Sequence, residues 1–418
     1  MNKNLKDFEK SLKAVAKELG IMSQEVSAAE FKASSELPEW EVRKLGGFAA
    51  CRALLYPETR VAGVGATATV QKGNFLKNKI KKQVNDEYLK LEFLEAFKEE
   101  IKNQPIKVHP ASKQKLKSGN KSRTTVVHVS DTHFGANIEA SEMNNVNEFN
   151  WVVASRRMAL LAEQTAGYKP QYRADTELVI VINGDIIAGV IHNQEWFADL
   201  LAKQTAGTIK ILTQFISYCA QFFGTVRVVM TSGNHGRAMH KGSKDRGTTH
   251  KWDSYETMIY LGVKYAVEAK CKNVKCQIPE TPYAIVEIQG HNFFITHGDT
   301  VINAGNPGSS LNMKSLNTQI MKLISSFKMP FAGVMLGHTH VSTVQTLDSS
   351  TKLLVNGTLS GADPYCQSIG IFSNNPEQTL FEVTKEHAVG DIRFIELTAA
   401  DDRKDLDKII EPLKGNLE

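Results

Sequence analysis

Cysteine is scarce and irregularly spaced in this sequence. The 418 residues include five cysteines, namely Cys51, Cys219, Cys271, Cys276 and Cys366. An odd number of scattered cysteines argues against a disulfide framework and predicts reduced thiols in a cytosolic compartment. The spacing of Cys271 and Cys276 fits half of a zinc site, but no second cysteine pair follows them, so we expect free thiols.

Long hydrophobic runs are also absent. No stretch of about 18 apolar residues occurs, so the sequence predicts no transmembrane helix. The segment M-N-K-N-L-K-D-F-E-K at the N-terminus is polar and lacks the apolar centre of a signal peptide. The 42% hydrophobic and 23% charged residues are typical of a soluble globular protein, and 418 residues predict two or three domains. We expect a cytoplasmic location, or the host cytoplasm if the origin is viral.

Acidic residues are too few to balance the basic residues in the N-terminal third. Residues 1–124 hold 24 Lys and Arg against 15 Asp and Glu, a net charge of +9, whereas the remainder holds 26 against 30, a net charge of −4. A basic region of this kind favours a polyanionic partner such as nucleic acid, and a solvated helical face is the alternative.

Short helices are predicted at the start of the chain. Apolar residues recur at helical spacing over residues 5–19, and three further short helices with tight turns are expected before residue 60. This density of helices favours a helix-turn-helix-like DNA-binding domain over residues 1–60. Residues 61–123 are expected to form a basic linker that contains an amphipathic helix over residues 85–101.

The N-terminal stretch resembles the small helical repeats of homing endonucleases and other DNA-processing enzymes. The shared features are a first helix ending in E-L-G, a W-E-V-R-K helix and a closing G-G-F-A-A-C-R-A-L segment. The resemblance implies DNA binding, with Arg43, Lys44 and Arg52 as candidate phosphate contacts. A helical module for protein–protein contact or dimerisation is the alternative.

From residue 124 onward, strands, polar motifs and long helices alternate, which predicts an α/β core. Strands are expected over residues 125–130, 178–183, 226–231, 284–289, 293–296, 333–336, 352–356 and 393–397. Helices are expected over residues 150–166, 206–223, 253–269 and 311–327. We expect this catalytic domain to span residues 124–400, followed by a tail helix over residues 401–418.

Five short polar clusters each follow one of the predicted strands. They are Asp131 and His133 in V-S-D-T-H, Asp185 in N-G-D, Asn234 and His235 in G-N-H, His297 in T-H-G-D, and His338 and His340 in G-H-T-H. In an open α/β sheet, ligand-binding groups collect at the carboxyl ends of the strands. We therefore expect the clusters to converge in space.

The chemistry of these clusters suits metal ions. Carboxylate and amide oxygens with imidazole nitrogens, and no thiolate, are ligands for hard or borderline divalent cations. Their number exceeds one tetrahedral site and fits two ions about 3.5–4 Å apart bridged by a carboxylate. Such a pair polarises phosphoryl oxygens and activates a bridging hydroxide for in-line attack on a phosphate ester. We expect Mn²⁺, with Fe²⁺, Zn²⁺ and Mg²⁺ left open.

The order D-x-H, G-D, G-N-H, a lone His before Gly and G-H-x-H resembles the calcineurin-like metallophosphoesterase superfamily from residue 124 to about residue 365. The form V-H-V-S-D-T-H-F-G looks closest to nuclease members, including the SbcD-type double-strand-break nucleases. This resemblance implies a β-sandwich flanked by helices (αββα), here preceded by a small all-α domain.

The resemblance also implies a role for each clustered residue. It implies a first ion held by Asp131, His133, Asp185 and His340, and a second held by Asp185, Asn234, His297 and His338, with Asp185 as the bridge. His235 is implied to be catalytic rather than a ligand, contacting the scissile phosphate and assisting the leaving oxygen.

Two motifs depart from the superfamily pattern. The second motif, G-D-I-I-A-G, lacks the second Asp and the Arg of the G-D-x-x-D-R-G found in protein phosphatases. The third, G-N-H-G, has Gly where those phosphatases have Glu and many nucleases have Asp. The departures argue against a Ser/Thr protein phosphatase, and they weaken a close match to the break-repair nucleases.

A basic segment directly follows His235. Residues 236–252 hold five Lys and Arg against one acidic residue, which suits a nucleic acid backbone or a second phosphate beside the centre. Arg237 is the candidate phosphate clamp, because a guanidinium can bind a phosphate with two hydrogen bonds. A mobile surface loop is the alternative.

The later segment N-G-T-L-S-G-A-D-P-Y-C resembles phage-type metallophosphoesterases. Its Tyr365 offers either stacking on a base or packing. His128, inside the first predicted strand, is expected to be structural.

These observations predict a metal-dependent nuclease, or another phosphodiesterase acting on DNA, with His235 and Arg237 as catalytic residues. The alternatives are a phosphomonoesterase or small-nucleotide phosphodiesterase, and a DNA-binding scaffold with an inactive metal centre. The sequence leaves open exonuclease against endonuclease action, RNA as substrate, a homo-oligomer and an ATPase partner.

Overall fold

The computed structural model describes part of the chain. The described residues are 97–99, 101–102, 106–110, 123–168, 177–190, 198–237, 250–305, 311–347, 350–368 and 375–413. The chain divides into two compact units, residues 1–97 and 98–418, and the fold below is that of the second. The predicted helical domain over residues 1–60, with Arg43, Lys44 and Arg52, lies outside the described residues.

The first sheet has six strands in the order β11-β10-β1-β2-β3-β4. The strands are β1 (Arg123–Val129), β2 (Glu177–Asn183), β3 (Thr225–Thr231), β4 (Val274–Gln277), β10 (Glu377–Thr384) and β11 (Gly390–Glu396). Strands β1 to β4 run parallel, whereas β10 and β11 extend the sheet in antiparallel fashion beyond β1. The four parallel strands therefore end at one edge of the sheet.

The second sheet has five strands in the order β5-β6-β7-β9-β8. The strands are β5 (Ala284–Ile288), β6 (His291–Ile295), β7 (Gly333–Leu336), β8 (Thr343–Thr346) and β9 (Lys352–Val355). Strands β6, β7 and β9 run parallel, and the two outer strands pair with them in antiparallel fashion. Both sheets are therefore mixed.

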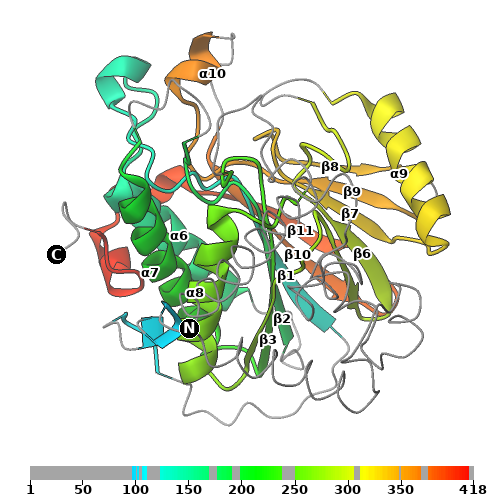
Figure 1. Cartoon of the computed structure of the whole chain (residues 1–418), viewed down its shortest axis with the longest axis horizontal. Helices are drawn as coiled ribbons and strands as arrows, with labels where there is room; N and C mark the ends of the chain where they lie inside the picture. Colours follow the sequence, from blue (N-terminus) through cyan, green and yellow to red (C-terminus); the bar gives the residue numbers. More distant parts are fainter. Residues whose placement is uncertain are drawn as a thin grey trace, which may run out of the picture. The chain divides into compact units, whose positions relative to one another are not determined.

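Helices cover the outer faces of both sheets, giving an α/β sandwich of four layers (Figure 1). Helices α6 (Trp151–Gly167), α7 (Leu201–Cys219) and α8 (Tyr255–Lys270) lie along the first sheet, and α9 (Met313–Phe327) covers the second. Asn150 starts α6, because its side chain accepts hydrogen bonds from the amides of Val152 and Val153. This arrangement confirms the predicted αββα order for the catalytic domain.

The main core lies between the two sheets. Alternate residues of each strand point inward, so Val126 of β1 and Val179 of β2 pack with Phe293, Ile295 and Met335 of the second sheet. Residues on the opposite faces of the same strands pack beneath the helices. Because each central strand is covered on both faces, its sequence is an almost unbroken apolar run.

A buried polar layer closes this core where the strands end. Thr231 donates a 2.7 Å hydrogen bond to Oδ1 of Asn183, and Nδ2 of Asn183 donates to the carbonyl of Thr296, 3.0 Å away in the other sheet. Nδ2 of Asn183 also lies 3.2 Å from Nε2 of His128, whose pKa is lowered by burial to about 3. The imidazole of His128 is therefore neutral, in keeping with its predicted structural role.

Some elements differ from the prediction. Strands β4 and β8 were not predicted, since V-K-C-Q and T-V-Q-T are not apolar runs. Strand β10 was also missed, although it pairs with β1 from Arg123 to His128. Helix α7 begins at Leu201, five residues before the predicted start at residue 206.

The predicted tail helix is replaced, within residues 401–413, by the 3₁₀ turn η4 (Lys404–Lys408). Ion pairs hold this turn against α6: Arg156 binds Asp407 at 2.9 Å, and Arg403 binds Glu163 at 2.8 Å. These side contacts, together with Pro412 shortly afterwards, favour a docked turn over a free helix. Residues 414–418 lie outside the described residues.

Part of the predicted basic linker is docked as well. Nζ of Lys107 donates to the carbonyl of Lys408, and a ring nitrogen of His109 lies 2.7 Å from the carbonyl of Ile409. Within the described residues, no helix is long and apolar enough to cross a bilayer.

Replacing Phe293 with Ala should lower the free energy of unfolding by about 3–5 kcal/mol, because the ring is fully buried between the sheets. Phe394→Ala is the matched control, since this ring is 44% exposed on β11. The control should cost less than about 1 kcal/mol. Urea unfolding followed by circular dichroism measures both, and equal losses would contradict the position of the core.

Candidate metal centre

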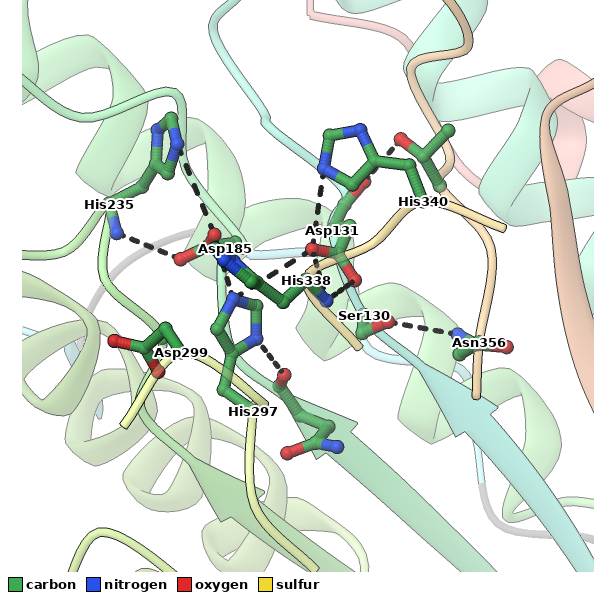
Figure 2. A network of polar contacts seen from close by, with 12 residues as sticks. Ser130, Asp131, Asp185, His235, His297, Asp299, His338, His340 and Asn356 are labelled. Carbon is green, nitrogen blue, oxygen red and sulfur yellow. Dashed lines mark hydrogen bonds and ion pairs between the residues drawn. The ribbon is translucent and has the colours of Figure 1, made fainter. Parts of the chain in front are cut away.

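The five polar clusters converge at the carboxyl ends of strands from both sheets. Asp131 follows β1, Asp185 follows β2 and His235 comes shortly after β3 in the first sheet. In the second sheet, His297 follows β6 and His338 follows β7. Figure 2 shows these side chains pointing toward one another from both sides. The centre therefore spans the junction between the two sheets.

Three groups of potential ligands form within this junction. They are Asp131, His133 and His340; His133, Asp185 and His235; and Asp185, His297 and His338. In each group the ligand atoms lie within 4.8 Å of one another. The first group contains three of the four residues predicted for one ion, and the third contains three of the four predicted for the other.

Backbone carbonyls orient the histidine rings. Nδ1 of His297 lies 2.8 Å from the carbonyl of Asn183, which leaves Nε2 2.8 Å from Oδ2 of Asp185. Nδ1 of His235 lies 2.6 Å from the carbonyl of Ala188, and its Nε2 is 4.0 Å from the same Asp185 oxygen. Each Nδ1–H donates to its carbonyl, so each Nε2 is directed toward Asp185 at the centre.

Backbone amides fix the two carboxylates. Both oxygens of Asp131 accept from the amide of His338, at 3.0 and 3.1 Å, which ties the first sheet to the second. Oδ1 of Asp185 accepts from the amide of His235 at 2.8 Å, which joins the segments after β2 and β3. The carboxylates are therefore preorganised by contacts that do not depend on other side chains.

The backbone of the centre is strained. Five site residues adopt the left-handed conformation, with φ of 52° at Asp131, 45° at His133, 49° at Asp185, 70° at His338 and 61° at His340. A side chain in that region costs of order 1–3 kcal/mol and persists where surrounding contacts overdetermine the conformation. Such strain concentrates at functional sites.

Glycines of the motifs allow the segments to approach closely. A side chain at Gly233 would collide with the carboxylate of Asp185, and one at Gly337 would collide with that of Asp131. Gly184, with φ of 78°, packs against Gly233 and the ring of His297. The glycines of G-D, G-N-H and G-H-x-H are therefore steric requirements of the centre.

The residues fit a pair of divalent ions. The side-chain oxygen of Asn234 is buried and has no hydrogen-bond partner among the described residues, as expected of a metal ligand. The donors are carboxylate, amide and imidazole groups, which suit borderline divalent metals. The buried His and Asp clusters are consistent with a dimetal centre, and they leave the identity of the metal open.

The charges of the centre also favour cations. Burial lowers the pKa of His297, but the carboxylates of Asp185 and Asp131 outweigh this and raise the value to about 9. Burial also lowers the pKa of His340, but Asp131 and Cys366 raise it to about 10. Burial would raise the pKa of Asp185, yet the neighbouring imidazoles of His297 and His235 hold it well below its usual range. Both carboxylates therefore stay charged.

Two cations of the predicted basic segment meet at one carboxylate. Arg237 binds Asp299 at 3.1 Å, and Lys251 forms an ion pair with the other oxygen of Asp299. Asp299 is the last residue of T-H-G-D and lies close to His297 (Figure 2). Nε of Arg237 is buried and has no hydrogen-bond partner within the part of the chain that the structure describes. Residues 238–249, between these two cations, lie outside the described residues.

Several functional side chains were missed in the sequence. Asp299 was visible within a motif, but its ion pairs were not predicted. Glu256 had no sequence signal, since it lies inside a predicted helix, and the structure buries its carboxylate beside the centre. Burial and the charge of Asp185 raise the pKa of Glu256 to about 7, although two backbone amides oppose the shift.

Tyr365, which the sequence analysis singled out, lies in the short helix α10 (Pro364–Ser368).

Comparisons with known proteins agree with this description. The family model described as calcineurin-like phosphoesterase matches residues 124–342. No curated protein sequence matches the chain. Solved structures with similar folds include Vps29 of Entamoeba histolytica complexed with zinc, 12% identical over 66% of this chain and 99% of that chain, with a TM-score of 0.27.

Two further similar structures are enzymes. A 5'-nucleotidase of Candida albicans is 12% identical over 74% of this chain and 56% of that chain, with a TM-score of 0.32. A dimetal phosphatase of Danio rerio is 9% identical over 66% of this chain and 99% of that chain, with a TM-score of 0.33. These TM-scores are low.

Metal binding should weaken as the pH falls. The pKa values of His297 and His340, near 9 and 10, mean that both rings are protonated at both nitrogens and positively charged at neutral pH. An incoming cation must displace one proton from each ring. For each displaced proton, the Mn²⁺ affinity should fall about tenfold when the pH decreases by one unit. Titration calorimetry in buffers of different protonation enthalpy measures the released protons. About two protons should be released at about pH 6 and at about pH 8 alike, and an affinity that does not change across this range, or no release of protons, would contradict this electrostatic description.

Proposed function

The chain belongs to the calcineurin-like phosphoesterase family, and from this premise we propose that it hydrolyses phosphodiester bonds of DNA. The chain is a metal-dependent phosphoesterase with a buried cluster of His and Asp ligands. DNA as the substrate is a more specific claim than phosphoester hydrolysis. It rests mainly on the placement of Arg237 and Lys251 beside the metal centre.

The two cations make the edge of the centre electropositive. Arg237 and Lys251 share the single charge of Asp299, which leaves one net positive charge next to His297 and His338. The intervening segment adds Lys241, Lys244 and Arg246 against one aspartate in the sequence. A polynucleotide presents further phosphates on either side of the scissile bond, and such cations suit that backbone.

Arg237 is well suited to a phosphate. Its guanidinium uses one terminal nitrogen on Asp299, while Nε has no partner among the described residues. A phosphodiester oxygen supplies the missing acceptor, and a guanidinium can bind it with two parallel hydrogen bonds. This supports the predicted role of Arg237 as a clamp.

The residues of the centre divide the chemistry between them. Asp131, His133, Asp185 and His340 would hold one divalent ion, and Asp185, Asn234, His297 and His338 the other. Such ions, when bound, supply Lewis acidity and lower the pKa of a bound water. His235 keeps Nδ1 on the carbonyl of Ala188, so its Nε2 is directed to the centre and can carry a proton to the leaving oxygen.

A smaller substrate is the second candidate. Asp299 neutralises much of the charge of Arg237 and Lys251, which favours a phosphomonoester or a small nucleotide over a long polyanion. The convergence of so many buried ligands disfavours the third reading of the sequence, a DNA-binding scaffold with an inactive centre.

A substrate panel separates the two enzymatic candidates. With Mn²⁺, the protein should cleave labelled single- or double-stranded DNA as well as bis-p-nitrophenyl phosphate. Arg237→Ala should lower kcat/KM for DNA at least about tenfold, a loss of about 1.4 kcal/mol, with a smaller effect on the small diester. Arg393→Ala, an exposed arginine on the outer strand β11, is the matched control.

Hydrolysis of the small diester without cleavage of either DNA would overturn the DNA proposal and favour the second candidate. Equal losses on DNA for Arg237→Ala and Arg393→Ala would remove the clamp from the mechanism.

The bridging role predicted for Asp185 can be tested separately. Asp185→Asn should leave less activity toward bis-p-nitrophenyl phosphate than His133→Ala, because Asp185 alone contributes to both predicted ion sites and loses its charge. Asp402→Asn, in an exposed turn, should retain wild-type rates. Steady-state kinetics at saturating Mn²⁺ provides the comparison, and equal residual rates for the two site variants would contradict a bridging role.

A further inference from the structure

The side chain of Glu256 occupies the space beside Gly236. A side-chain carbon built on Gly236 would lie 2.5 Å from Cγ and 3.0 Å from the carboxyl carbon of Glu256. Gly236 occupies the position after His235, where the sequence lacks the acid that the resemblance leads one to expect. The structure therefore places the carboxylate of Glu256, on helix α8, next to the position where the family pattern has an acidic side chain.

Glu256 connects two segments that carry metal-binding residues. Its Oε1 accepts a 2.8 Å hydrogen bond from the amide of Ile186, the residue after Asp185. Its Oε2 accepts a 2.6 Å bond from the amide of Gly233, the residue before Asn234. One side chain thus holds the ends of β2 and β3 at a fixed separation.

The separation matters because the two segments are in close contact. Gly233 lies so near the carboxylate of Asp185 that any side chain there would collide with it. The amide of His235 also donates to Asp185, so a shift of the segment after β3 would move Asn234 and the carboxylate apart. Both residues belong to the predicted second ion site.

A fully buried carboxylate is costly unless both oxygens are bonded, and those of Glu256 are. Glutamine has the same size but offers one acceptor oxygen, so its amide group would face a backbone N–H. One of the two ties would therefore be lost without a change of volume.

We propose that Glu256 is a positioning residue of the metal centre, which sets the distance between Asp185 and Asn234 from helix α8 and thereby completes the second ion site. This inference rests on the metal-binding role of the centre and not on DNA as the substrate.

Ion binding tests the proposal directly. Titration of the full chain with Mn²⁺, followed by calorimetry and by the electron paramagnetic resonance of free Mn²⁺, resolves the two binding events. Glu256→Gln should weaken one of the two events, the one at the site that contains Asn234, about 10- to 100-fold and leave the other within a few-fold. The failure of DNA cleavage would not affect this measurement, so the two proposals fail independently.

Glu268→Gln is the matched control. Glu268 lies on the same helix and also accepts a hydrogen bond from a backbone amide, that of Cys276 at 2.8 Å, but at the other end of the helix. A purely structural role for Glu256 predicts that both variants lower the unfolding temperature and that both keep two ions with wild-type affinity. That outcome would overturn the proposal.

A carboxylate introduced at position 236 should restore ion binding after Glu256 is replaced. The backbone of Gly236 is outside the left-handed region, and Glu256→Ala removes the two closest atoms. Cβ of residue 256 remains 3.2 Å from the new side chain, a contact that a shift of a few tenths of an ångström relieves. Glu256→Ala should lose the second ion, and Glu256→Ala with Gly236→Asp should regain it to within about tenfold, since the new carboxylate enters the same space. A folded double variant as weak as Glu256→Ala would overturn the claim that the carboxylate sets the spacing.

Discussion

The hydrogen bonds from the amide of His338 to Asp131 are the contact on which the centre depends. They join the end of β1 to the end of β7, and so fix the two sheets at the edge where all five clusters meet. Asp131 and Asp185 are buried there at 0% and 1% exposure, and neither could remain charged in that position without amide donors and neighbouring imidazoles. The inter-sheet core sets the orientation of the strands, and these bonds convert that orientation into a site.

The sequence predicted the centre better than its surroundings. Asp131, Asp185, His297 and His340 were identifiable because each follows an apolar strand, and parallel strands end at a common edge. Glu256 was not identifiable, since a helical glutamate normally faces solvent and only the folded chain shows it buried against two backbone amides. Strand β10 was missed for a related reason: Glu382, inside it, is compensated by Arg123 of the neighbouring strand, a partner 259 positions away in the sequence.

Charge pairing links the metal centre to the proposed substrate. Asp299 belongs to the same short motif as His297, yet it binds Arg237 and Lys251 rather than joining the ligand groups. The motif T-H-G-D thus serves two purposes: its histidine belongs to a ligand group, and its aspartate pairs with Arg237 and Lys251 on either side of residues 238–249. Glu256 has a parallel role on the other side, where it holds the segments that carry Asp185 and Asn234. The centre is organised by carboxylates that are not ligands themselves.

The left-handed backbone at five residues of the centre has a consequence for the order of folding. Asp131 and His338 are 207 positions apart, so the contacts that stabilise these conformations exist only after both sheets have formed and packed. The centre is thus among the last parts of the domain to acquire its structure, and a partly folded chain has no high-affinity place for a cation. Ions that bind only the native state would therefore stabilise the packed sandwich against unfolding.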